Sequence, residues 1–315
     1  MRHSTASRTG PAETITQAII DRLEAGTRPW VRPWTGAPVS RPLRACGTPY
    51  RGINVLWLWM AAEAAGHNSP HWLTYRQAQI EGGQVRKGER GTVAIFYRSY
   101  VRHHAETDED GQSGGETRRV LKSFVVFNAC QIEGLPDRYF PAPPSIPAEP
   151  TARDTDLDAF FSALPARIRH QGCESYYRSD ADEITMPDPS LSRDRDHYRA
   201  TLAHELSHWT GHTSRLARSL GTRFGSAAYA AEELIAELSA AMLGAELGLP
   251  VTHLDHHASY VASWLKILKS DSRAILTAAA KAEEASSLLL QLGRLQTPDA
   301  RSLEALLPER LAVAA

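Results

Sequence analysis

Apolar and polar residues follow two different periods along this 315-residue chain. In the first 135 residues both periods occur. A period near 3.6 predicts helices over residues 14–25 and 55–65, and alternation of apolar with polar residues predicts strands over 92–101 and 119–128. Residues 104–117 are acidic and glycine-rich, which is typical of a solvent loop between two strands. This part of the chain has the pattern of an α+β domain.

Beyond residue 150 the helical period dominates. It predicts helices over residues 154–164, 198–209, 230–247 and 257–292, with two short strands around 175–177 and 183–186. The strand at 183–186 comes shortly before a helix. We expect it to form a sheet edge that can receive an extended peptide by strand addition.

Proline marks the boundary between the two patterns. Residues 136–150 hold six prolines in fifteen residues, a composition typical of a linker. We therefore predict the α+β fold class with two domains. An N-terminal α+β domain covers residues 12–135, a linker 136–152, a mostly helical domain 153–295 and a C-terminal tail 296–315.

The distribution of charge indicates the kind of partner, and the cysteine content indicates the cellular compartment. Residues 1–130 carry 17 Lys and Arg against 11 Asp and Glu, a net charge of +6, and the rest carry 18 against 25, a net charge of −7. A basic first half suggests a polyanionic partner. The three cysteines form no C-x-x-C pair, which favours a reducing compartment. The longest apolar run, Val55–Ala65, is too short to span a membrane. We expect a cytoplasmic protein without a membrane partner.

The sequence His204-Glu205-Leu206-Ser207-His208 carries the clearest chemistry. On a helix, positions i and i+4 lie on the same face, so His204 and His208 can offer two imidazole nitrogens to one ion. Glu205 reaches the same opening and can take a proton from a water that the ion activates. This H-E-x-x-H arrangement is typical of zinc metallopeptidases. The flanking apolar residues indicate a buried helix rather than two surface histidines around a solvated Glu.

A third ligand is expected downstream. The version with a further His six residues after the second His fails, because that position is Ser214. The predicted helix over 230–247 is apolar yet carries Glu232, Glu233 and Glu237, and a buried charge needs a partner or a metal. Glu233 and Glu237 are four residues apart, so one can bind the ion while the other hydrogen-bonds a ligand histidine. Glu232 is expected on the solvated face.

Arginines and aromatic residues alternate in the loops of the first half. Cations contact phosphates and aromatic rings stack on bases, and together they are the two ingredients of single-strand binding. The alternative is a set of packed loops whose rings cover a core. The residues predicted to contact single-stranded DNA are Arg28, Trp30, Arg32, Trp34, Tyr50, Arg51, Tyr75, Arg76, Arg86 and Lys87.

Several segments together resemble one family, the ArdC-type antirestriction proteins of conjugative plasmids. The segments of the first half are Pro29–Trp34, Tyr50–Asn54, Trp72–Ala78, Gly83–Gly88, Phe127-Asn128, Gln131-Ile132 and Gly134-Leu135. Those of the second half are His204–Trp209, Arg223–Gly225, Tyr229-Ala230, Glu232–Glu237 and Ala262–Leu265. They occur in the expected order over most of residues 14–290.

The resemblance implies a domain that binds single-stranded DNA joined to a zincin-like peptidase domain of the gluzincin type. It implies His204, His208 and Glu233 as ligands of one Zn²⁺ ion, with Mn²⁺ as an alternative metal, and Glu205 as the catalytic base. Glu237 takes the position of the residue that supports the ligands. The implied role is the protection of incoming plasmid DNA from restriction.

Two other functions remain open. One is a non-catalytic protein that binds single-stranded DNA and keeps a structural zincin domain. The other is a regulatory metalloprotease that cleaves a protein partner. Glu205 argues for chemistry, because a structural zinc site needs no acid or base.

Overall fold

The computed structural model describes residues 10–30, 40–103, 115–141, 152–218, 226–249 and 260–295. These residues form two compact units, which confirms the two-domain α+β architecture. The first unit contains the described residues of 10–18, 42–50 and 54–141, and the second contains those of 19–41, 51–53 and 152–295. The second unit is therefore discontinuous in sequence. It takes short segments from the N-terminal part of the chain.

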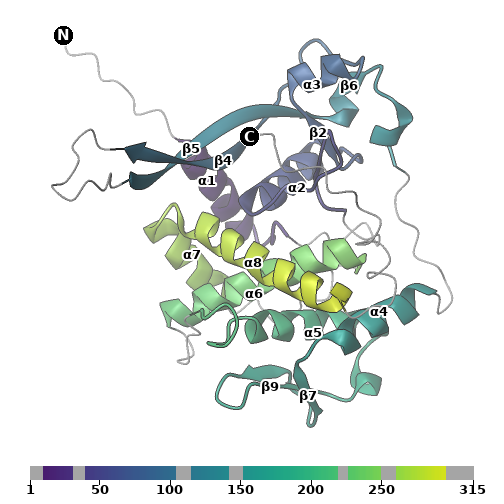
Figure 1. Ribbon diagram of the computed structural model, residues 1–315, viewed down its shortest axis with the longest axis vertical. Helices are drawn as coiled ribbons and strands as arrows, with labels where there is room; N and C mark the ends of the chain where they lie inside the picture. Colours follow the sequence, from purple (N-terminus) through teal and green to yellow (C-terminus); the bar gives the residue numbers. More distant parts are fainter. Residues whose placement is uncertain are drawn as a thin grey trace. The chain divides into compact units, whose positions relative to one another are not determined.

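The first unit is built on a sheet with the strand order β1-β2-β5-β4. Strands β4 and β5 pair in an antiparallel register from Thr92 opposite Val126 to His103 opposite Gly115, the long ribbon of Figure 1. A smaller sheet pairs β3 with β6. The elements up to residue 133 are α1 (Pro11–Glu24), of which residues 19–24 belong to the second unit, β1 (Leu43–Arg44), α2 (Ile53–Ala65), β2 (His71–Leu73), α3 (Tyr75–Ile80), β3 (Gln84–Val85), β4 (Thr92–His103), β5 (Gly115–Asn128) and β6 (Ile132–Glu133).

Side chains alternate between the two faces of the β4–β5 hairpin, and one face packs against α2. Ala94 and Val126 point to one face and are fully buried with Leu58 and Ala62 of α2. Gly91, just before β4, lies close to β5, since a Cβ there would be 2.2 Å from a methyl carbon of Val125. The predicted helices and strands of this half are all present. Thr74 caps α3, as expected, by accepting a hydrogen bond from the backbone N–H of Gln77 at 3.2 Å.

The second unit packs helices against one another and against a small sheet. In Figure 1, α5, α6 and α8 lie together, and β9 of the small sheet lies beside α5. The elements are α4 (Ala152–Ala163), β7 (Arg167–His170), β8 (Tyr176–Arg178), β9 (Glu183–Met186), α5 (Arg195–Trp209), α6 (Ala227–Leu247), α7 (Val261–Ser270) and α8 (Ala274–Leu295). Short 3-10 turns cover Ala129–Gln131, Asp137–Tyr139 and Pro189–Leu191.

Capping residues define the ends of α5 and α6, and buried leucines hold the two helices in one core. Asp194 caps α5 by accepting from the N–H of His197 at 2.7 Å, and Ser226 caps α6. Gly248 ends α6 with a φ of 67°, a left-handed conformation that glycine adopts without strain. Leu206 on α5 and Leu243 on α6 are fully buried in one core with Ile184 of the sheet. The apolar flanks of the H-E-x-x-H segment are buried, as predicted.

Two expectations from the sequence need correction. The strand at 183–186 was expected at a sheet edge, but β9 is the central strand between β7 and β8. The edge strand that runs antiparallel to it is β8. Residues 136–141 were assigned to the linker, yet they belong to the first unit, where Tyr139 is buried. Residues 104–114, 142–151 and 296–315, parts of the predicted loop, linker and tail, lie outside the described residues.

Among the described residues, no helix has the length and the apolar character needed to cross a bilayer.

The discontinuous second unit makes a prediction about cleavage. Residues 19–30, 40–41 and 51–53 precede the proline-rich segment but belong to the unit that follows it. Trp30 packs edge-on against Trp264, and Arg41 forms an ion pair with Glu283. A specific protease site inserted between Pro147 and Ala148 should therefore yield two pieces that elute together from a size-exclusion column. Separation of the pieces without denaturant would contradict this assignment.

Candidate metal centre

Helix α5 brings the two histidines of the motif to one point. The Nε2 atoms of His204 and His208 are 3.2 Å apart, and both residues lie on the same face of the helix, as their spacing predicts. The helix is held against α6 by a buried hydrogen bond of 2.9 Å between the hydroxyls of Ser207 and Ser239. The position of α6 therefore fixes what faces the two imidazoles.

Glu233 on α6 faces both imidazoles. Its Oε2 lies 3.6 Å from Nε2 of His204, and its Oε1 lies 3.7 Å from Nε2 of His208. Among the described residues, His204, His208 and Glu233 form a group whose ligand atoms all lie within 4.8 Å of one another. Ligands of a tetrahedral Zn²⁺ ion at 2.0–2.2 Å are about 3.3 Å apart. The three side chains fit a divalent cation of that size.

The charges of this group support one another. Burial lowers the pKa of His204, but the carboxylates around it, first that of Glu233, outweigh burial and raise the pKa to about 9. Burial raises the pKa of Glu233, and the two histidines together lower it to about 2. Without a metal, the Glu233 carboxylate therefore favours the protonated form of the His204 imidazole. A cation would replace that proton.

Glu205 is buried next to the histidines. Burial raises the pKa of its carboxyl group, while His204 and His208 lower it. The backbone of Tyr177, on the edge strand β8, also bonds this carboxylate and lowers its pKa. The motif glutamate thus lies between the histidines and the edge of the small sheet, and it takes no place in the three-residue ligand group.

Two tyrosines line the other side of Glu233, and the motif gave no signal for them. The hydroxyls of Tyr229 and Tyr260 are 3.3 Å apart, and the Tyr229 hydroxyl also bonds Glu233. Tyr260 stacks on Trp264, with ring centroids 6.2 Å apart. Trp264 in turn donates a hydrogen bond of 2.9 Å to the backbone carbonyl of Ala230 on α6.

Glu232 corrects a sequence prediction. It was expected on the solvated face of its helix, but it is buried and its Oε1 lies 3.2 Å from Nδ1 of His208. Arg218, which no sequence motif marks, bonds both oxygens of Glu232, at 3.0 and 2.7 Å. Burial raises the pKa of Glu232, but His208 and Arg218 outweigh it and hold the pKa below its usual range. The apolar run around Glu232 was the signal that pointed to burial.

Glu237 was predicted to support a ligand histidine and stays a prediction in that role. Its Oε1 accepts a hydrogen bond of 3.2 Å from Arg28, and its side chain is fully buried. Burial raises the pKa of Glu237 to about 7, against the effects of His204 and Arg28. The sequence predicts that Arg28 contacts DNA. In the structure, Arg28 instead forms an ion pair with Glu237, one turn after Glu233.

Several other residues predicted to contact DNA are not available as stacking surfaces. Trp30 is 2% exposed and packs against Trp264, and Tyr50 is 4% exposed. The alternative of loops whose rings cover a core is therefore right for these two residues. Arg51 is exposed and lies 3.9 Å from Glu283. Arg32 and Trp34 lie outside the described residues.

The remaining predicted DNA contacts gather around α3 and β3. Tyr75 is 46% exposed and lies edge-on to Phe127, with ring centroids 6.5 Å apart. Arg76 follows it on α3 and is exposed, as are Arg86 and Lys87. Arg86 forms an ion pair with Glu89 at 2.7 Å, so its charge is partly used within the protein.

Family models match both units of the chain. The model described as the N-terminal domain of anti-restriction factor ArdC matches residues 11–127. The model described as a zincin-like metallopeptidase matches residues 155–281. The crystal structure of the antirestriction protein ArdC from the R388 plasmid, in its metal-free form, is 41% identical with a TM-score of 0.76, covering 91% of this chain and 98% of that one.

The chain belongs to the ArdC antirestriction family.

This ArdC-family chain is also similar to other proteins over most of its length. The Mn(II)-bound structure of R388 ArdC is 40% identical with a TM-score of 0.74, over 91% of this chain and 99% of that one. The uncharacterized protein y4eC of Sinorhizobium fredii is 41% identical over 86% of this chain and 89% of its own length. A DNA primase TraC of Escherichia coli is 38% identical over 94% of this chain. The chain spans only 28% of that primase.

We predict that metal binding by this family member depends on pH, because the carboxylates around His204 raise its pKa against the effect of burial. An imidazole must lose its proton to bind a metal, so well below pH 9 about one proton should leave His204 for each ion bound. Apparent affinity for Mn²⁺ or Zn²⁺ should therefore rise with pH up to about 9. Calorimetric titration in two buffers of different ionisation enthalpy counts the protons released. Heats that do not depend on the buffer would contradict the prediction.

Proposed function

We propose that this ArdC-family chain is a zinc-dependent peptidase that also binds single-stranded DNA with little sequence preference. The observation that carries the first part is the convergence of His204, His208 and Glu233 with Glu205 buried beside them. Mn²⁺, the ion bound in the R388 structure, is the alternative to Zn²⁺. When bound, such a cation polarises a peptide carbonyl and activates water.

Glu205 supplies the proton transfers of this proposal. Its carboxylate accepts the proton of the attacking water and then passes it to the nitrogen of the leaving amine. Burial, which raises the pKa of Glu205, makes it a better base than an exposed carboxylate. The site also has a way to hold a peptide, because β8 is an edge strand beside Glu205 and can accept an extended chain by strand addition.

The DNA-binding part of the proposal centres on Tyr75. Its exposed ring is held from the side by Phe127 and at its hydroxyl by a hydrogen bond of 3.0 Å from Gln84. A base can stack on a ring that is already fixed without further ordering of the side chain. Arg76, next to it on α3, and Lys87, shortly after β3, are exposed and can contact phosphates.

Together, these activities suit the protection of incoming plasmid DNA from restriction inside the recipient cytoplasm. The DNA-binding unit would hold the entering single strand, and the peptidase unit would act on a protein partner. Each of the two alternative functions lacks one of these two activities. A structural zincin domain would bind metal without hydrolysis, and a regulatory protease would cleave a partner without binding DNA.

The peptidase proposal is tested at Glu205. Glu205→Gln keeps the shape of the side chain but removes the base, so it should retain metal within about twofold and lose hydrolysis by about 10²–10⁴-fold. Cleavage of labelled casein, with and without single-stranded DNA, and metal analysis give the two readouts. Glu174→Gln, at an exposed position of the same unit, is the control.

Equal turnover in the Glu205→Gln variant would rule out this mechanism. A metal-loaded protein with no turnover in any form would favour the structural zincin domain.

The DNA proposal is tested by two variants with different expected effects. Tyr75→Ala removes a stacking face worth about 1–3 kcal/mol and should weaken single-strand binding by about 5–150-fold at an unchanged salt slope. Replacing Arg76 and Lys87 together by Ala should flatten the salt slope. Fluorescence anisotropy with single-stranded and duplex oligonucleotides over a range of salt measures both.

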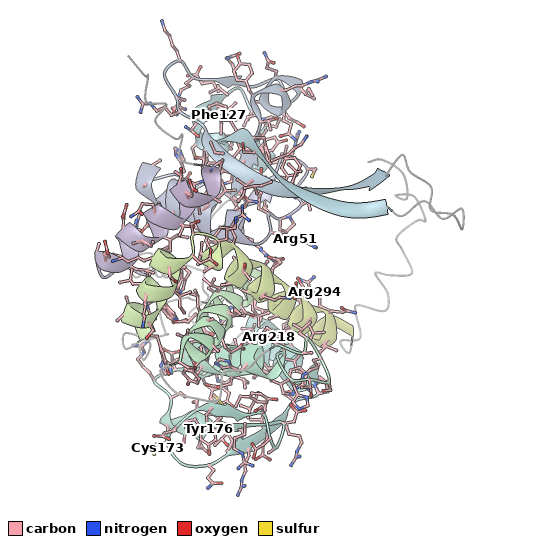
Figure 2. The ribbon with its side chains drawn as sticks, turned by 90° about the vertical axis from the view of Figure 1, so that its left-hand side faces the viewer. Arg51, Phe127, Cys173, Tyr176, Arg218 and Arg294 are labelled. Carbon is pink, nitrogen blue, oxygen red and sulfur yellow. The ribbon has the colours of Figure 1, made fainter. Side chains whose placement is uncertain are left out.

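Tyr176→Ala is the matched control, because Tyr176 is 43% exposed, much like Tyr75 at 46%, but lies in the peptidase unit (Figure 2). Loss of binding in the control, or equal affinity for duplex and single strand, would count against stacking at Tyr75.

A further inference from the structure

Arg218 connects the C-terminal end of α5 to Glu232 on α6 through hydrogen bonds. It lies in the loop after α5, beside the helices of the second unit (Figure 2), and its side chain is 4% exposed. Its Nη2 donates to the backbone carbonyl of Ser207 at 2.7 Å, and its Nη1 donates to the hydroxyl of Thr210 at 2.8 Å. The remaining bonds go to Glu232 on α6. The guanidinium is thus fixed to α5 on one side and to a carboxylate of α6 on the other.

Glu232 passes this constraint to a ligand. Its Oε1 lies 3.2 Å from Nδ1 of His208, whose Nε2 faces His204 and Glu233. An ionised carboxylate can only accept, so Nδ1 carries the proton. The lone pair of His208 is then at Nε2, the nitrogen that points into the ligand group.

We propose that Arg218 is a positioning residue of the metal centre, which acts through Glu232 to hold His208 in its ligand tautomer and orientation. The inference rests on the metal-binding part of the proposed function and goes beyond it. A planar guanidinium with several donors can bond Glu232, Ser207 and Thr210 at once, whereas a single ammonium cannot match that geometry. The planar guanidinium therefore fixes the orientation of the Glu232 carboxylate in addition to supplying a positive charge.

The same loop contains a matched arginine without a link to a ligand. Arg215 is also largely buried, bonds the backbone carbonyl of Trp209 at 2.7 Å and lies over the Trp209 ring. Its carboxylate partner is Asp182, which it bonds through two nitrogens. Arg215 and Arg218 therefore share burial, loop and chemistry, and they differ in whether their carboxylate touches a metal-ligating histidine.

The experiment compares full-length Arg218→Lys, Arg218→Met and Glu232→Gln with Arg215→Lys. Affinity for Zn²⁺ is measured by competition with a chelator, and the visible spectrum of the Co²⁺-substituted protein reports the geometry around the ion. All three changes at Arg218 and Glu232 should lower affinity about 10–100-fold and alter the Co²⁺ spectrum. Arg215→Lys should lower the melting temperature of the metal-free protein and leave both metal readouts unchanged.

Three results would overturn the inference. Full affinity in Arg218→Lys would mean that charge alone matters. Loss of melting temperature at Arg218 with unchanged metal readouts would mean a structural ion pair like that of Arg215. An equal loss of affinity in Arg215→Lys would mean that the whole loop, and not Arg218, holds the site. If the unsubstituted chain binds no Zn²⁺, the proposed metal centre itself fails, which a chelator competition shows before any variant is made.

Discussion

The burial of charge around α5 and α6 is the constraint on which the second unit depends. Among the described residues, the acidic side chains that are buried are Glu205, Glu232, Glu233 and Glu237. All four lie on these two helices. A buried carboxylate without a partner costs several kcal/mol, so each must face a cation, a donor or a metal. The partners come from different parts of the chain, which ties those parts together.

The partners of the buried groups on α6 explain why the second unit is discontinuous in sequence. Glu237 is neutralised by Arg28, which stands more than 200 residues earlier in the sequence. Trp30 follows two residues later and packs against Trp264, which bonds the backbone of α6 one turn before Glu233. The N-terminal segment therefore contacts α6 directly through Arg28, one turn after Glu233, and indirectly through Trp264 before it. A segment with the composition of a nucleic-acid loop is here part of the metal-site scaffold.

The same constraint separates the roles of similar residues. Glu232 and Glu233 are adjacent on α6, yet one faces the Nε2 atoms of both histidines and the other faces Nδ1 of His208. Their pKa values are both held below the usual range, by His204 and His208 at Glu233 and by His208 with Arg218 at Glu232. In the metal centre proposed above, the two adjacent glutamates thus take different roles, one as a ligand and one as the support of a ligand, because they face different nitrogens of the His208 ring.

The sequence by itself determined the elements and the centre of the site. Periodicity located most of the helices and the long hairpin, but it predicted one helix over 257–292 where the structure has two, α7 and α8. The i, i+4 spacing of His204 and His208 places both on one face of a helix. Glu205 and Glu233 followed from the motif and from the family resemblance.

Only the tertiary structure decided the partners: Arg218 for Glu232, Arg28 for Glu237, and β8 rather than β9 as the sheet edge. It also decided that Trp30 and Tyr50 are buried while Tyr75 is exposed. The physical reason is that local patterns report which face of a helix or strand is apolar. The partner of a buried charge depends instead on how distant segments pack, and no local period encodes that.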